Sequence, residues 1–148
     1  MVTSRLVRNI MRLCFLMERR YAPCSKMLET AFGRLSCAGA LTPALTAALR
    51  SGNWREREAS PTTIYEYLAR YHHSLAITPP LSPEVSPFYK RPFVVIHADR
   101  FAEAIQAQIE DPAVLALPPH RGGVDQYTDS TPLLSDSNLR RLNLTRID

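Results

Sequence analysis

Hydrophobic positions along the chain recur mostly at helical spacing. Residues 3–20 are the clearest case, because apolar side chains cover more than half of the helix circumference there. These side chains are Leu6, Val7, Ile10, Met11, Leu13, Cys14 and Met17. A helix that is apolar on so many sides needs packing partners on several sides. Because this helix begins almost at Met1, we expect a preceding segment in a larger parent protein.

Three more helices and one short helical piece are predicted between residues 25 and 75. Residues 25–35 carry apolar positions at helical spacing. A third helix is predicted to begin at Pro43, a favourable first helical residue, with Thr42 as its N-cap. Residues 54–58 form a short helical piece, and a Ser-Pro pair then restarts a separate helix over 60–75.

The second half of the chain holds shorter elements. Residues 78–92 contain five prolines and are predicted to be an extended connector. The run 93–96 is strand-like but has no evident partner, so we expect a buried extended segment rather than a sheet. Helical pieces are predicted to start at Asp99, at Asp111-Pro112 and at Thr131-Pro132.

Length and composition fit one globular domain. The chain has 148 residues, 45% hydrophobic and 22% charged. We therefore expect residues 1–148 to form a single all-α, bundle-like helical domain with at most one short strand. The chain has only five glycines but twelve prolines, so we do not expect a glycine-rich loop that binds phosphate.

The charge and the cysteine content limit which partners and which cellular compartment we expect. The net charge is +4, but residues 1–57 carry ten basic and three acidic residues, whereas residues 58–148 carry a net charge of −3. The three cysteines have no metal-binding spacing, and no secretory signal is recognisable, so we expect a reducing cytoplasm. The apolar run 13–17 is far shorter than the ~20 residues of a membrane span, so no membrane partner is expected.

A basic cluster at the junction of the first two predicted helices is the main candidate site. It consists of Arg19, Arg20, Tyr21, Ser25 and Lys26. The N-terminal N–H groups of a helix over 25–35, with two arginines and a lysine nearby, would suit a triphosphate or another polyanion. The alternative is that the two arginines only solvate a helix end, where the helix dipole favours cations.

Two other patterns of basic residues are weaker candidates. His72 and His73 are adjacent, so on a helix they point about 100° apart and cannot share a metal as an i, i+4 pair does. We therefore expect both to be surface residues near a helix end. Arg91 and His97 are similar in spacing to the Arg–His pair of HEPN-type ribonucleases, but the interval begins with proline and is extended.

The remaining polar residues give no catalytic centre. Residues 118–131 are predicted to be a loop, and within it Asp129, Ser130 and Thr131 fit capping and turn roles ahead of Pro132. The sequence contains no Asp-x-Asp pair, no HExxH, no GxSxG and no Walker loop. We therefore expect no catalytic residues, no metal ligands and no cofactor in this chain.

A set of short motifs spans nearly the whole chain. The set comprises Arg8–Pro23, Ser25-Lys26, Asn53-Trp54-Arg55, Arg91-Pro92-Phe93, Ile96-His97-Ala98, Arg100-Phe101, Asp111-Pro112, Leu117-Pro118, Val124-Asp125-Gln126 and Asp129-Ser130-Thr131. Together these motifs resemble a bacterial family named only as a domain of unknown function (number forty thirty-seven). The chain departs from that pattern at Cys24 and Met27, where the family would have aromatic residues, and at Pro61.

The resemblance implies a two-part parent protein. Its N-terminal half would be nucleotidyltransferase-like, with a Gly-Ser motif and carboxylates for Mg²⁺. Its helical C-terminal half, the part similar to this chain, resembles the C-terminal domain of kanamycin nucleotidyltransferase. Lys26 and Ser25 would then contact the triphosphate, Arg19 and Arg20 would neutralise charge, and Tyr21 would stack or hydrogen-bond. Glu18 is a candidate base toward an acceptor hydroxyl, but a carboxylate that only occupies a helix end is the favoured interpretation.

We therefore expect the nucleotide-binding half of a nucleotidyltransferase-like protein that is inactive alone. Its partners would be the N-terminal domain and a nucleotide, with Mg²⁺ and NTP needed by the whole parent; a nucleic-acid partner is not expected. A HEPN-like ribonuclease that uses Arg91 and His97, and a non-catalytic interaction module, are the alternatives.

Overall fold

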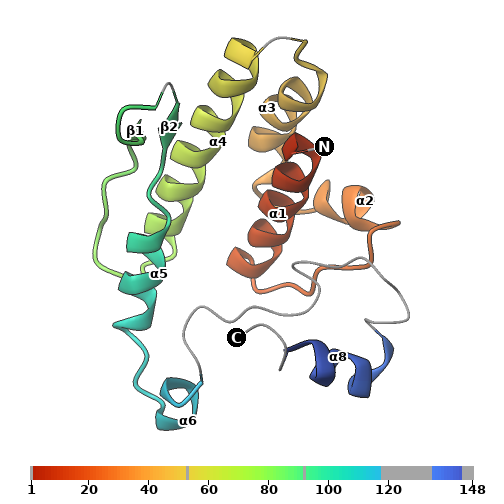
Figure 1. Ribbon diagram of the computed structural model, residues 1–148, viewed down its shortest axis with the longest axis vertical. Helices are drawn as coiled ribbons and strands as arrows, with labels where there is room; N and C mark the ends of the chain where they lie inside the picture. Colours follow the sequence, from red (N-terminus) through yellow and green to blue (C-terminus); the bar gives the residue numbers. More distant parts are fainter. Residues whose placement is uncertain (1, 53, 92, 118–134, 145–148) are drawn as a thin grey trace. The chain divides into compact units, whose positions relative to one another are not determined.

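The described part of the chain consists of helices, connecting segments and one small hairpin. The structure, a computed structural model, describes residues 2–52, 54–91, 93–117 and 135–144. They fall into two compact units, Met1–Glu110 and Asp111–Asp148. In chain order the elements are α1 (Val2–Met17), α2 (Leu28–Phe32), α3 (Ala38–Arg50), α4 (Trp54–Ser74), β1 (Ser86–Pro87), β2 (Val94–Val95), α5 (Asp99–Gln106), α6 (Pro112–Leu115) and α8 (Ser137–Leu144) (Figure 1). The predicted all-α fold is confirmed, whereas the single folding unit stays a prediction.

The hydrophobic core of the first unit lies among its first four helices. The helix α3 packs along α4, and α1 packs against α3 (Figure 1). The largest side chains that are almost fully buried are Leu41 of α3, Ile64 of α4, Cys14 of α1 and Cys37 at the N-cap of α3. Val7, Ile10 and Cys14 of the predicted apolar set are buried, whereas Leu13 of that set is 43% exposed and the buried Phe15 was not in it.

The third helix begins earlier than predicted. It starts at Ala38, so Pro43 lies inside it and Thr42 is no N-cap; the Thr42 hydroxyl donates to the carbonyl oxygen of Ala38 at 2.7 Å. An internal proline removes one backbone hydrogen bond. Ala38 and Leu41 are nevertheless buried in the core, and this packing outweighs the local preference that the Thr-Pro pair expresses.

The fourth helix is continuous where two pieces were predicted. It runs from Trp54 to Ser74 with Pro61 inside it. Beyond the proline, Ile64, Leu68 and Ala69 are buried and fix this part of the helix against the core. The proline therefore costs a backbone hydrogen bond without ending the helix.

The Pro-rich connector folds back to form the hairpin. Ser86 and Pro87 of β1 pair antiparallel with Val95 and Val94 of β2. The expectation that the run 93–96 has no strand partner is therefore wrong. A two-residue partner in a proline-rich segment produces no alternation of apolar and polar residues, and so gives no strand signal.

One arginine holds the connector to the segment after the hairpin. Arg100, in the first turn of α5, donates through Nε to the carbonyl oxygen of Ile96 at 3.2 Å. Its Nη2 donates to the carbonyl oxygens of Ser82 at 2.7 Å and Glu84 at 3.4 Å. We call this set of contacts the Arg100 clasp.

The start of α5 and the second unit complete the described chain. The N-cap of α5 is Ala98, so Asp99 lies in the first turn rather than at the cap. The predicted start at Asp111-Pro112 is confirmed, because the Asp111 carboxylate accepts from the N–H of Ala113 at 2.8 Å at the start of α6. The expected helix start at Thr131-Pro132 lies outside the described residues.

Candidate functional site

The first helix ends in a left-handed turn that carries an arginine. The N–H of Arg20 donates to the carbonyl oxygen of Phe15 at 2.8 Å, and the N–H of Arg19 donates to that of Leu16 at 2.9 Å. Arg19 has a φ of 53°. These two hydrogen bonds, together with the left-handed conformation of Arg19, define a Schellman cap.

An arginine is an unusual residue for the left-handed position of such a cap. Glycine usually occupies the left-handed position of a Schellman cap, because a Cβ atom there costs roughly 1–2 kcal/mol. Here the position is Arg19, and the side chains of Arg19 and Arg20 are both exposed. The cap therefore presents two neighbouring guanidinium groups to solvent at a cost in backbone energy.

The second helix is shorter than predicted and begins later. It spans Leu28–Phe32 with Met27 as its N-cap, and Ser25 to Met27 form a turn ahead of it. The predicted bounds 25–35 are wrong, because turns at Ser25–Met27 and at Gly33 limit the helix to the stretch that carries the buried Leu28 and Phe32. Ser25 and Lys26 thus lie ahead of the helix rather than in its first turn.

All five predicted site residues lie on the connector between α1 and α2, and each is exposed. Tyr21 is 96% exposed. Because α2 begins at Leu28, Ser25 and Lys26 are not at the N-terminal N–H groups of a helix, and the features that the structure gives an anion here are exposed cationic side chains. We call Arg19, Arg20, Tyr21, Ser25 and Lys26 the basic corner.

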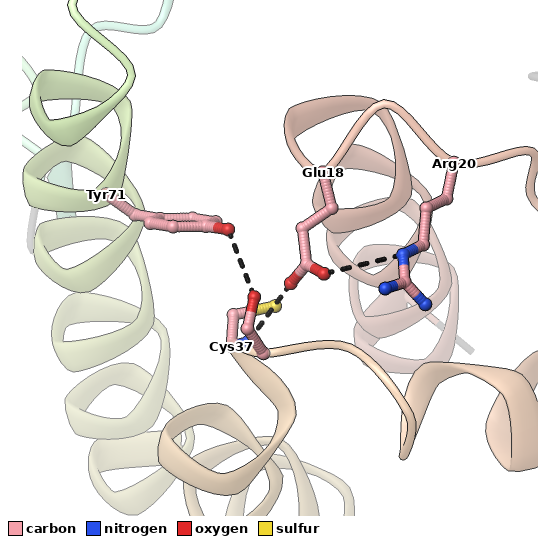
Figure 2. Close-up of polar contacts among 5 residues, drawn as sticks. Glu18, Arg20, Cys37 and Tyr71 are labelled. Atoms are coloured by element: carbon pink, nitrogen blue, oxygen red, sulfur yellow. Dashed lines mark hydrogen bonds and ion pairs between the residues drawn. The ribbon is translucent and has the colours of Figure 1, made fainter.

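Glu18, beside the basic corner, has a structural role that its sequence position does not reveal. Its Oε1 accepts a hydrogen bond from the backbone N–H of Cys37 at 3.1 Å, and its Oε2 lies 3.9 Å from Nε of Arg20 (Figure 2). The side chain is only 7% exposed. Tyr71 approaches the same place from α4, with its hydroxyl 3.5 Å from that of Ser36.

The protonation of Glu18 argues against its candidate role as a base. Burial disfavours the charged carboxylate, but hydrogen bonds from the Ser36 hydroxyl and from the backbone N–H groups of Cys37 and Ser36 outweigh it. The net effect lowers the pKa of Glu18 to about 2. A carboxylate this weakly basic is a poor general base near neutral pH. Its contacts identify it instead as a cap for the start of α3.

The adjacent histidines fix the chain beyond α4 and do not share a ligand. The Nε2 of His72 lies 2.8 Å from the Thr78 hydroxyl, whereas the Nε2 of His73 accepts from the N–H of Leu81 at 2.6 Å. His72 is buried and its ring meets the edge of Phe101 with centroids 5.3 Å apart. The expectation of a surface position is therefore wrong for His72.

The Arg91–His97 pair has no helical geometry. Arg91 is an exposed residue of the hairpin loop, and its N–H donates to the carbonyl oxygen of Phe88 at 3.1 Å. His97 has a φ of 52° and precedes α5. The spacing typical of HEPN ribonucleases places the pair on one helix, and here β2 separates the two residues.

Other site predictions concern ligands and membranes. In the part of the chain that the structure describes, no cluster of three His, Cys, Asp or Glu side chains is arranged to hold a metal ion. None of the described helices is long and apolar enough to cross a membrane. The polar loop with Asp129, Ser130 and Thr131 lies outside the described residues.

Comparison with family models, with curated proteins and with solved structures gives no match for this chain. The family resemblance based on the short motifs therefore stays a prediction.

Proposed function

We propose that this chain is the nucleotide-binding helical half of a nucleotidyltransferase-like protein, and that its basic corner pairs with a triphosphate. The observation that carries the proposal is Arg19 in the left-handed position of the α1 cap. Backbone conformations that cost energy persist where the side chain has another use. Glycine would relieve this cost, and an arginine is there instead.

The chemistry of the corner suits a polyanion. Arg19, Arg20 and Lys26 place three cations on one exposed connector. Arginine and lysine bind phosphate oxygens through charge-assisted hydrogen bonds. The ion pair with Glu18 orients the Arg20 guanidinium, and the exposed ring of Tyr21 offers a stacking surface for a base.

A second domain completes the proposal. Leu13 and Leu16 of α1 are 43% and 71% exposed, and apolar surface of this kind supports contact with a partner. In this proposal the N-terminal nucleotidyltransferase-like half covers that surface and supplies the carboxylates that hold Mg²⁺. The assembled protein would act in the cytoplasm.

Titration of ATP into the chain, followed by NMR or calorimetry, tests the corner. We expect weak binding that is further weakened by salt, because charge pairing dominates. Lys26→Ala and Arg19→Gly should each weaken binding roughly tenfold by removing a charge-assisted contact. Arg19→Gly should also stabilise the fold by about 1 kcal/mol, because glycine tolerates the left-handed conformation.

Two control variants distinguish specific nucleotide binding from two other effects: the loss of any positive charge, and the removal of backbone strain. Arg34→Ala removes an exposed cation just beyond α2 and should leave ATP affinity unchanged. Ala76→Gly relieves the left-handed residue after α4, with its φ of 51°, and should stabilise the fold without changing affinity. Equal affinity in Lys26→Ala, Arg34→Ala and the parent chain would exclude the corner as a site. Nucleotide transfer by the chain alone would contradict its assignment as one half of an enzyme.

A further inference from the structure

A groove lies between the hairpin and the first and fourth helices. It has a volume of about 860 Å³ and is lined by Leu6 of α1, Tyr65 of α4, Phe88 and Tyr89 of the hairpin loop, and His97 and Asp99 at the start of α5. Figure 1 shows the hairpin alongside α4, and β2 contacts that helix. Volumes of about 300–1,000 Å³ are typical of small-molecule sites.

The wall on the hairpin side consists of ordered aromatic rings. The Phe88 ring stacks on Phe93 with centroids 5.7 Å apart, and meets Tyr89 edge-on at 4.9 Å. Tyr89 is nevertheless 85% exposed, so its ring contributes little to the core. The ring is held in place by its neighbour while most of its surface stays open to a ligand.

Backbone strain occurs at two residues of the same groove. Tyr89 and His97 have φ values of 54° and 52°, in the left-handed region that favours glycine. His97 is held there by a contact of 2.9 Å between its Nε2 and the Ser86 hydroxyl. Strained residues that gather at one groove are typical of binding sites.

The charge of the groove selects the ligand. Of the described residues that line it, Asp99 is the single one with a fixed charge, and its carboxylate has no ion-pair partner within the described chain. Aromatic faces also attract cations through their quadrupole. We propose that the groove binds a small organic ammonium ion with an apolar or aromatic body, with Asp99 as its counter-ion.

This site goes beyond the proposed nucleotide function. Leu6 lies in the first part of α1, whereas Arg19 follows its end at Met17; Leu6 and Met17 alone are about 17 Å apart at the helical rise of 1.5 Å per residue. The groove and the basic corner therefore attract ions of opposite sign at separate places.

NMR titration of the full chain with two molecules of similar shape tests the groove. Phenethylammonium carries the charge, and 2-phenylethanol is its neutral counterpart. We expect the ammonium ion to bind roughly tenfold more tightly and to shift the signals of Tyr65, Tyr89 and His97. Equal affinities, or shifts confined to other residues, would overturn the proposal.

Three variants test which residues give the groove its preference for the ammonium ion. Asp99→Asn keeps the side-chain shape and should abolish the preference for the cation. Tyr89→Ala changes an exposed ring and should weaken both molecules, so it tests the groove even if Asp99→Asn disturbs α5. Glu103→Gln, an exposed carboxylate farther along α5, should leave both affinities unchanged. A preference for the cation that persists in Asp99→Asn would overturn the assignment of the counter-ion.

Discussion

The carboxylate of Glu18, one residue beyond α1, accepts a hydrogen bond from the backbone N–H of Cys37, one residue ahead of α3. The first N–H groups of a helix lack partners within the helix, and a carboxylate at that end is also favoured by the helix dipole. The side chain of Cys37, the N-cap residue, makes no capping hydrogen bond. Glu18 therefore joins the end of one core helix to the start of another.

Removing the Glu18 carboxylate should destabilise the fold. Glu18→Ala leaves the N–H of Cys37 without this acceptor, and a buried donor without a partner costs about 1–3 kcal/mol. Glu18→Gln keeps an acceptor oxygen and should cost less. Urea denaturation measures both losses, with Glu29→Gln on the exposed side of α2 as the control. A loss in Glu18→Ala no larger than in the control would exclude the cap.

The same contact should make stability sensitive to acid. Because the pKa of Glu18 is lowered from its ordinary value of 4.5 to about 2, the charged form stabilises the fold. This stabilisation is complete above pH 4.5 and is lost as the pH falls through 2. Glu18→Gln should therefore lose less stability than the parent chain between these values. Parallel acid-denaturation curves for the two proteins would contradict this linkage.

The three cysteines should differ sharply in reactivity. Burial raises the pKa of the Cys14 thiol, and burial likewise raises that of Cys37, so neither offers an accessible thiolate. Cys24 is exposed. An aromatic disulfide reagent should thus modify Cys24 rapidly in the folded chain, and Cys14 and Cys37 only after unfolding. Rapid modification of all three thiols under native conditions would show that the α1–α3 core is not closed.

His72 should make the fold less stable in mild acid. Burial lowers the pKa of His72, and the neighbouring His73 adds to this effect. The unfolded chain then binds the proton more readily, so stability decreases as the pH falls below the ordinary value of 6.5. His72→Gln should remove this contribution. NMR titration of the His72 ring checks the cause directly, since a midpoint at or above 6.5 would contradict it.

Local patterns in the sequence predicted that a helix is present more reliably than they predicted the residues at which it begins and ends. Val7, Ile10 and Cys14 of the predicted apolar face are buried because burial of one face determines where a helix packs, whereas Leu13 of the same set is 43% exposed. The Thr42-Pro43 start failed because the packing of Ala38 and Leu41 overrides a capping preference of about 1 kcal/mol. Tertiary contacts that local spacing does not encode decided this boundary.

The candidate site shows the same division. The sequence was enough to group the residues of the basic corner, because charged residues close together in the chain stay close on one connector; their role as a site stays a prediction. The role of Glu18 depends on Cys37, which is nineteen residues away, so no local motif encodes it. The groove likewise combines Leu6, Tyr65 and Asp99 from three helices, and the aromatic residues around Pro92 were the one local sign of it.

The Arg100 clasp determines where the chain tolerates inserted residues. Proline carries no N–H group, so a proline-rich segment is held mainly through its carbonyl oxygens, and here the Arg100 guanidinium donates hydrogen bonds to those of Ser82 and Glu84. An inserted residue between Ser82 and Ser86 would displace these oxygens from Arg100 and the β1 residues from their partners. An insertion at Lys90, on the exposed hairpin turn, disturbs neither. Length variation among natural relatives of this chain should therefore concentrate at that turn and be rare in the segment before it.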